Sequence, residues 1–273
     1  MAYAFGIDTE QYSSSDINDR VQKMMNWQTA ALYQPLIRFV FVRSGISWGY
    51  KDTRFNFNWD GVRSMDFYRA QAGISALPVG RGAYHVLYPG QDETAQYDNF
   101  MRIVDPVADW AHDRAVIDLE LHQSQSRRTI TDRTKRFAYK IRAATGNYPI
   151  LYARSIWLNT YTYPAEMNFM DLWLAQYLNT QTPYTPEYPP PPSTLPGGFR
   201  TWLIHQTGDH CPPIGSPVKT YMDYNRWNGD EVAVAKYFGY EIKPPPEPEP
   251  EPEPVYDLDW LIRIHTTHTN EHP

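Results

Sequence analysis

Short apolar runs recur along the chain, and each is bounded by Gly, Pro, Asn or Asp. β-Branched and aromatic residues are frequent in these runs, which is typical of β-strands. Several runs are apolar at successive positions, as expected for strands that are covered on both faces. The pattern predicts eight strands, at residues 5–8, 38–44, 79–88, 115–121, 150–154, 172–177, 202–206 and 221–224.

Helical periodicity lies between the early strands, whereas the later strands have little helix between them. A serine cluster can cap the first helix, and Gly73 and Gly146 can end the second and the fourth. Pro106 predicts a kink or break in the third helix. The four predicted helices span residues 16–32, 60–72, 93–112 and 131–145.

The order of these elements indicates the fold class. Alternating strands and helices predict right-handed parallel crossovers. Eight strands in a chain of 273 residues predict a closed barrel. We therefore expect an α/β fold, an irregular TIM-like (β/α) barrel over residues 1–243 with few helices in its second half.

The chain changes character after Lys243. Residues 244–254 alternate Pro and Glu, which predicts a stiff, extended polyproline II linker. Residues 255–273 are too short for a domain, but their apolar side chains would line one face of a short helix. We interpret them as a docking peptide for a protein partner, with a disordered tail as the alternative.

Charge is unevenly distributed along the chain. The formal net charge is −6, and residues 244–273 alone carry seven acidic residues and one basic residue, so the rest of the chain is balanced. A neutral body without clustered Lys and Arg argues against nucleic acid as the partner. No apolar run approaches the length of about 18 residues that a membrane span needs. The N-terminal residues lack the basic and apolar segments of a signal peptide.

Metal-binding residues are sparse. The single cysteine, Cys211, permits no intrachain disulfide, and one neighbouring histidine is too few ligands for a metal site. We interpret the histidines near the C-terminus, His265, His268 and His272, as part of a solvated tail. We therefore expect neither a metal nor a cofactor.

Two acids stand two residues apart in the apolar run at 115–121. Side chains at this spacing share one face of a strand, so Asp118 and Glu120 would point together into a mostly hydrophobic space. Repulsion between like charges raises one pKa, which leaves one protonated acid and one carboxylate near neutral pH. Glycoside hydrolysis needs such a pair, and two solvated acids at a strand end are the alternative.

Two further acids, Asp8 and Asp223, lie in the first and last predicted strands. These strands are neighbours in a closed barrel. If the strand ends face one rim, Asp8, Asp223 and the Asp118–Glu120 pair meet in a single cleft at the C-terminal face, where barrel enzymes hold their active sites.

Eight short stretches of the sequence carry a family resemblance. They are Phe-Gly-Ile-Asp (5–8), Phe-Val-Phe-Val-Arg-Ser-Gly (39–45), Pro-Val-Gly-Arg-Gly-Ala-Tyr-His (78–85), Val-Ile-Asp-Leu-Glu (116–120), Tyr-Pro-Ile-Leu-Tyr (148–152), Leu-Trp-Leu-Ala-Gln-Tyr (172–177), Ile-His-Gln-Thr (204–207) and Met-Asp-Tyr-Asn-Arg-Trp (222–227). In this order, covering residues 3–240, they resemble glycoside hydrolase family 25, the lysozymes of the Chalaropsis type.

The resemblance implies an irregular β/α barrel that hydrolyses the β-1,4 bond between N-acetylmuramic acid and N-acetylglucosamine in bacterial peptidoglycan. It implies that Glu120 is the general acid. Asp118 is then either a nucleophile or the group that orients the substrate's own acetamide, and Asp8 and Asp223 match supporting acids. Four further residues match the lining of the family's sugar site: Tyr84, Tyr152, Trp173 and Gln206.

Two departures from the family pattern stand out. Thr9-Glu10 replaces a Val-Ser pair after the first Asp, which adds a carboxylate near the mouth of the cleft. A Pro-rich insertion at residues 184–198 would reshape the rim or contact a partner. Neither departure removes a catalytic position.

The same features also indicate alternative functions and the place where the protein would act. A catalytically silent wall-binding or virion structural module on this fold is the main alternative to an enzyme. A chitinase-like barrel is disfavoured, because Val-Ile-Asp-Leu-Glu lacks the longer Asp-rich strand of those enzymes. Without a signal peptide, a wall-cutting enzyme is expected to be made in the cytoplasm and to act after release, as a phage endolysin does, or to travel on a virion.

Overall fold

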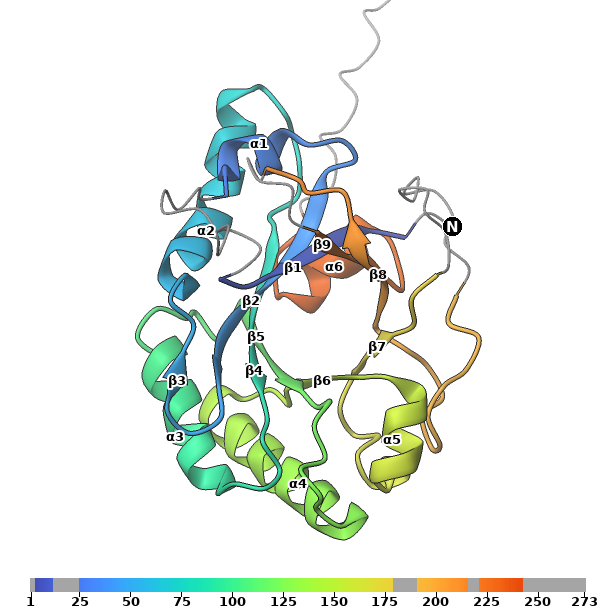
Figure 1. Cartoon of the computed structure of the whole chain (residues 1–273). Coiled ribbons are helices and arrows are strands. Elements are labelled where there is room, and N and C mark those ends of the chain that lie inside the picture. The colour runs from blue at the N-terminus through green and yellow to red at the C-terminus, as the bar shows by residue number, and fades with distance from the viewer. Residues whose placement is uncertain (1–2, 12–24, 179–190, 216–220, 243–273) are drawn as a thin grey trace, which may run out of the picture. The chain divides into compact units, whose positions relative to one another are not determined.

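The computed structural model describes residues 3–11, 25–178, 191–215 and 221–242 of the chain. Within them, eight strands close a barrel in the order β1, β9, β8, β7, β6, β5, β4, β2, with β1 also paired to β2 (Figure 1). The barrel strands are β1 (Phe5–Thr9), β2 (Ile37–Ile46), β4 (Gly80–Val86), β5 (Asp113–Asp118), β6 (Ile150–Ala153), β7 (Leu172–Ala175), β8 (Ile204–Cys211) and β9 (Met222–Trp227).

Strand direction divides the barrel into two parts. The pairs from β1 through β2 and β4 to β8 are parallel, whereas β9 runs antiparallel between β8 and β1. All eight predicted strands are present. The pattern did not predict β3 (Tyr50–Lys51), a short strand that forms an antiparallel hairpin with the end of β2. The barrel class is confirmed.

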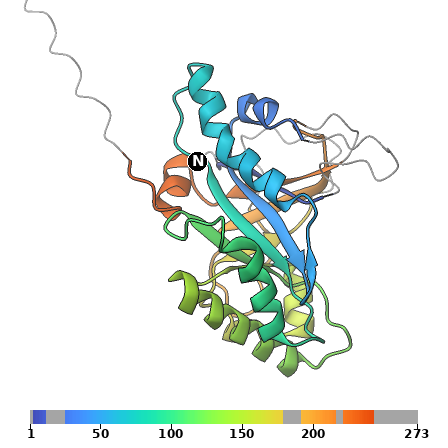
Figure 2. The ribbon, with the colours of Figure 1, turned by 90° about the vertical axis from the view of Figure 1, so that its left-hand side faces the viewer.

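The main helices lie outside the barrel. They are α1 (Trp27–Leu32), α2 (Phe55–Gln71), α3 (Glu93–Val104), α4 (Arg127–Thr145), α5 (Ser155–Tyr161) and α6 (Glu231–Tyr237), with a 3-10 turn, η1 (Pro164–Glu166). Figure 2 shows α2, α3 and α4 along one side of the barrel. None of the helices described is long and apolar enough to cross a membrane.

Helix boundaries differ from the prediction in several places. α3 ends at Val104, ahead of Pro106, so the predicted helix to residue 112 is too long. α2 and α4 begin earlier than predicted, at Phe55 and Arg127. The predicted helix at 16–32 is described only from Trp27, and its first part lies outside the described residues. The short helices α5 and α6 were not predicted.

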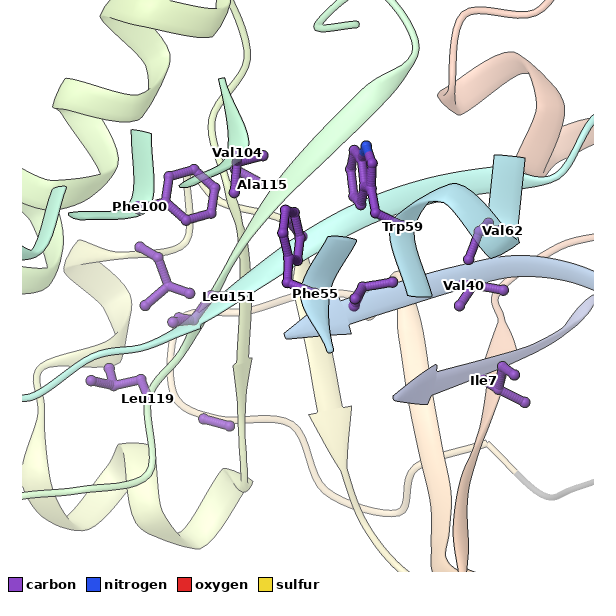
Figure 3. Close-up of a cluster of buried hydrophobic side chains, with 14 of the residues drawn as sticks. Ile7, Val40, Phe55, Trp59, Val62, Phe100, Val104, Ala115, Leu119 and Leu151 are labelled. Carbon is purple, nitrogen blue, oxygen red and sulfur yellow. The ribbon is translucent and has the colours of Figure 1, made fainter. Parts of the chain in front are cut away.

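Two hydrophobic layers sandwich the barrel wall, because successive side chains of a strand point to opposite faces. The inner layer fills the barrel, with Phe39 and Phe41 of β2 and Trp227 of β9 among its members. The outer layer joins the wall to the helices. Figure 3 shows part of it, where Phe55 and Trp59 of α2 lie with residues of β1 and β2.

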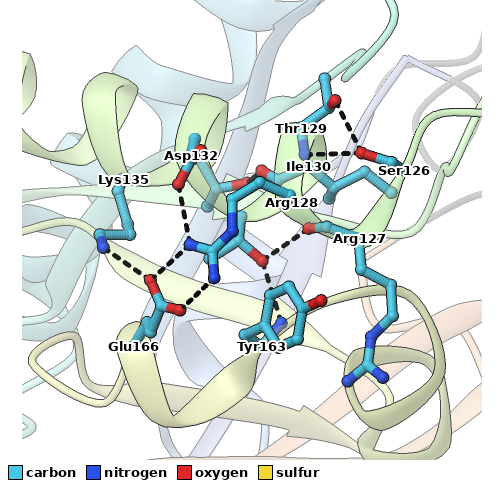
Figure 4. A network of polar contacts seen from close by, with 11 residues as sticks. Ser126, Arg127, Arg128, Thr129, Ile130, Asp132, Lys135, Tyr163 and Glu166 are labelled. Carbon is cyan, nitrogen blue, oxygen red and sulfur yellow. Dashed lines mark hydrogen bonds and ion pairs between the residues drawn. The ribbon is translucent and has the colours of Figure 1, made fainter.

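Polar contacts attach the 3-10 turn to α4. Ser126 caps α4 by accepting a hydrogen bond from the backbone N–H of Thr129 at 3.1 Å. Along the same helix, Arg128 and Lys135 both pair with Glu166, at 2.7 and 2.9 Å (Figure 4). These ion pairs lie at the surface, where each contributes little to stability. They orient the chain between α5 and β7 rather than hold the core together.

Candidate active site

The cleft begins where the inward side of the barrel changes from apolar to polar. Val116 and Ile150 belong to the inner hydrophobic layer, and the next inward residues along these strands are Asp118 and Tyr152. A cavity of about 310 Å³ opens above this layer, at the carboxyl ends of the parallel strands. Its lining consists of Asp8, Arg43, Tyr84, Val86, Asp118, Glu120, Tyr152, Trp173, Tyr177, Gln206, Asp209 and Asp223.

All eight residues that the sequence predicted for the site therefore lie in one cavity. Asp223 reaches the rim in an unexpected way, because β9 is antiparallel and its beginning lies beside the end of β1. Asp8 and Asp223 are direct partners in that pairing. A larger depression, of about 600 Å³, lies at the opposite ends of β7 and β8, around Asp171 and Trp202. It does not contain any of the predicted acids.

Hydrogen bonds hold Asp8 in one orientation. Its Oδ2 atom accepts from Asn225 Nδ2 at 2.8 Å and from Gln206 Nε2 at 3.0 Å. Tyr152 donates to Gln206 Oε1 at 2.7 Å, and Trp173 donates to Asn225 Oδ1 at 2.8 Å. Because each amide oxygen already accepts a bond, each amide nitrogen is directed at Asp8. Tyr152 and Trp173, which were expected to line a sugar site, thus also orient the two amides that donate to Asp8.

Asn225 is a member of this network that sequence reasoning missed. It lies two residues after Asp223 in β9, on the same inward face of the strand. The spacing rule that joined Asp118 to Glu120 would have indicated it.

Asp8 and Asp223 share a proton. Burial raises the pKa of Asp8, but hydrogen bonds from Asn225, Asp223 and Gln206 oppose that shift. The pKa of Asp223 rises to about 10, first through burial and then through the charge of Asp8 and the hydrogen bond to it. The hydrogen bonds therefore favour the charged form of Asp8, and the charge of Asp8 favours the protonated form of Asp223.

The Asp118–Glu120 pair is asymmetric. Asp118 is the last residue of β5 and is buried, with 8 % of its surface exposed. Glu120 follows two residues later and is exposed at the mouth, so the strand predicted at 115–121 ends before it. The two carboxyl groups are hydrogen-bonded to each other. The pair is thus one buried acid beneath one accessible acid, rather than two acids enclosed together.

The pKa shifts follow this asymmetry. Burial raises the pKa of Asp118 well above its usual range, and the charges of Glu120 and Asp8 raise it further. Desolvation also raises the pKa of Glu120, but the charge of Arg154 and the hydrogen bond from Asp118 oppose it. The two shifts therefore favour the shared proton on Asp118. The sequence predicted a shared proton but not its position.

Two arginines at the rim were not predicted as site residues. Arg43 pairs with Glu10 at 2.7 Å and with Asp52 at 2.8 Å. The unusual carboxylate of Glu10 is thus held by a cation that lines the cleft. Arg154 is exposed, and its guanidinium lies 4.8 Å from the ring centre of Tyr177.

The described part of the Pro-rich insertion lies against the same rim. Ser193 N–H donates to Gln176 Oε1 at 2.7 Å, next to Tyr177 of the cleft. Residues 184–190 of the insertion lie outside the described residues. Within the described ranges, no three His, Cys, Asp or Glu side chains are grouped to hold a metal ion.

Comparison with known proteins places this geometry in context. The sequence model of "Glycosyl hydrolases family 25" matches residues 15–211. A bacterial lysozyme from Streptomyces coelicolor is 23 % identical, with a TM-score of 0.65 over 88 % of this chain and 98 % of its own. A muramidase from Acremonium alcalophilum is 19 % identical, with a TM-score of 0.62 over 86 % of this chain and 99 % of its own.

A third similar structure is the catalytic domain of endolysin ply40 from bacteriophage P40 of Listeria monocytogenes. It is 15 % identical, with a TM-score of 0.61 over 87 % of this chain and 98 % of that one. A search of curated protein sequences gives no match. At these identities the solved structures establish a common fold.

Proposed function

Because this chain belongs to glycosyl hydrolase family 25, we propose that it cleaves the β-1,4 bond between N-acetylmuramic acid and N-acetylglucosamine in peptidoglycan. The observation that carries the proposal is the convergence of Asp8, Asp118, Glu120 and Asp223 in one cavity at the carboxyl rim of the barrel. Their raised pKa values allow an acid and a carboxylate to coexist near neutral pH.

Glu120 is the proposed general acid, since its carboxyl group is the accessible member of the pair. A sugar that occupies the cleft covers Glu120 and removes water from it, which raises its pKa. The proton then moves from Asp118 to Glu120, in position to protonate the leaving glycosidic oxygen. Binding therefore converts the resting pair into the reactive one.

Asp118 is better placed to assist the substrate than to attack it. In a retaining glycosidase with an enzyme nucleophile, the two carboxyl groups flank the bond at about 5–5.5 Å. Here they interact directly through their side chains, which favours an assisting role for Asp118 over direct attack. Asp118 lines the cavity, so its carboxylate can meet a bound sugar. We propose that the Asp118 carboxylate accepts a hydrogen bond from the N–H of the substrate acetamide. The acetamide oxygen then attacks the sugar carbon.

The supporting pair stabilises the developing positive charge. Asp8 remains charged because Asn225 and Gln206 donate to it, and its negative charge faces the cleft. Asp223 carries the proton that prevents repulsion between the two. We infer that Asp8 acts on the transition state through its charge and not by proton transfer.

The substitution Glu120→Gln tests this assignment. It removes the transferable proton while preserving shape, and we expect release of reducing ends from purified walls to fall by about 10²–10⁴-fold. Glu166→Gln, a change in the surface ion pairs of α4, serves as the matched control and should retain activity. Wild-type clearing by Glu120→Gln would refute the general-acid role. A wall-binding module without turnover would yield no new reducing ends even from the unmodified protein.

A further inference from the structure

An exposed tryptophan stands at the tip of the β2–β3 hairpin. Trp48 is 63 % exposed, and Tyr50 beside it is 38 % exposed. Together with Tyr88 they border an open depression of about 550 Å³. Figure 1 shows β3, the second strand of this hairpin, beside α3. A large apolar side chain held in water is unfavourable. The chemistry proposed for the active-site cleft does not explain why Trp48 is exposed.

The hairpin is held rigidly. Asn99 of α3 donates to the backbone oxygens of Ser47 and Tyr50, at 3.0 and 3.1 Å, on either side of the tip. Ser47 has the left-handed φ of +57°, and its hydroxyl is hydrogen-bonded to Gln91. A flexible surface loop would lose entropy on binding, whereas a tip held in this way presents Trp48 in advance.

Two segments of the chain carry residues of both the cleft and the depression. On β2, Arg43 lines the cleft and Ile46 lines the depression. At the end of β4, Val86 lines the cleft, and Tyr88, two residues later, lines the depression. These steps of two and three residues correspond to roughly 7–10 Å along an extended chain. A linear polymer that leaves the cleft in this direction passes over Trp48.

The lining indicates the chemical class of the ligand. Aromatic faces alternate with the polar groups of Ser47 and Gln91, and none of the described residues that line the depression is charged. A sugar ring presents an apolar face of C–H bonds and a rim of hydroxyl and amide groups, which matches this mixture. An acidic peptide or a phosphate would require cations that the lining lacks.

We propose that Trp48 and its neighbours form an accessory subsite for the neutral glycan backbone of the strand whose other end occupies the cleft. The inference rests on the proposed function, because it requires a glycan strand in that cleft. It predicts an enzyme whose efficiency increases with the length of the strand.

Trp48→Ala tests the subsite by comparing two substrates: long, peptide-free glycan strands, and the shortest oligosaccharide that the wild-type enzyme cleaves. We expect kcat/KM on long strands to fall by about 3- to 10-fold, the usual effect of losing one aromatic contact, with little change on the short substrate. Trp48→Phe should recover part of the loss. Phe67→Ala, at an aromatic on α2 that is 60 % exposed, is the control and should affect neither substrate.

The outcomes separate this inference from the proposed function. If the wild-type enzyme releases no reducing ends, the proposed function fails. If it does release them, but Trp48→Ala alters both substrates equally or neither, the accessory subsite is refuted. Thermal unfolding of the variants excludes loss of fold as the cause of a decrease.

Discussion

Asp118 holds a carboxyl group where burial opposes its ionisation. Its pKa is raised first by desolvation and then by the charges of Glu120 and Asp8. The folded protein therefore binds a proton at this residue more tightly than the unfolded chain does. A group of this kind stabilises the fold at pH values below its unfolded pKa, and that stabilisation is lost as the pH rises towards the folded pKa. At neutral pH the site thus costs stability.

Asp118→Asn should separate stability from function. Asparagine keeps the size of the side chain but does not titrate, so we expect Tm at pH 7 to rise by a few degrees while wall hydrolysis is lost. The gain should shrink at about pH 3, where the carboxyl group is mostly protonated in the unfolded chain as well. Thermal unfolding at the two pH values measures this. Asp98→Asn, at an exposed position of α3, is the control. A lower Tm at pH 7 would show that the carboxyl group stabilises the fold.

At the scale of elements, contacts at the amino ends of the strands hold the barrel in register. Arg81 of β4 and Asp113 of β5 are paired in the sheet and form two hydrogen bonds, at 2.9 and 2.8 Å. Both are buried, and the guanidinium lies 4.1 Å from the ring centre of Trp59. This rim lies at the opposite end of the barrel from the candidate active site, and contacts at that end serve stability rather than chemistry.

Asp113→Ala should be strongly destabilising. It leaves the Arg81 charge buried without its partner, which typically costs about 3–5 kcal/mol in free energy of unfolding. Urea denaturation measures the loss. The double variant Arg81→Met with Asp113→Ala should recover part of it, because no unpaired charge remains. Equal losses in the single and double variants would show that the ion pair is not the cause. The change Glu166→Gln, in a surface ion pair, should have a much smaller effect.

Tertiary packing also decides where elements begin. The stretch before Asp60 alternates apolar and polar residues, which is a strand-like pattern, yet it forms the first turns of α2. Phe55 and Trp59 are fully buried there, with ring centres 5.3 Å apart. Their spacing of four residues places them on one helical face towards the barrel. Burial against the wall thus outweighed the local pattern.

At the scale of the whole molecule, the chain divides into a compact unit over residues 1–242 and a second unit from residue 243. The second unit lies outside the described residues, so the linker and docking-peptide hypotheses remain predictions. Residues 244–273 of that segment carry a charge equal to the net charge of the protein, −6.

Deleting residues 244–273 tests the docking peptide. The cleft is built entirely within the first unit, so we expect kcat/KM on soluble glycan strands to change by less than about twofold. Assembly state and localisation to walls should change, as measured by light scattering and by co-sedimentation with walls. A truncated protein that assembles and localises like the full chain would refute the docking hypothesis.

The sequence by itself determined the strands and the barrel class, because alternation along a strand is local. It also predicted the eight residues that the barrel brings into one cavity. Two-residue spacing already placed Asp118 and Glu120 on one face, and the family resemblance supplied the residues that line the sugar site. Only the tertiary structure decided how these groups act on one another. Asn225 donates to Asp8 across 217 residues of sequence, and Gln206 across 198. The antiparallel direction of β9 and the deeper burial of Asp118 determine which acids hold protons. Such long-range contacts and degrees of desolvation exist only once the barrel closes.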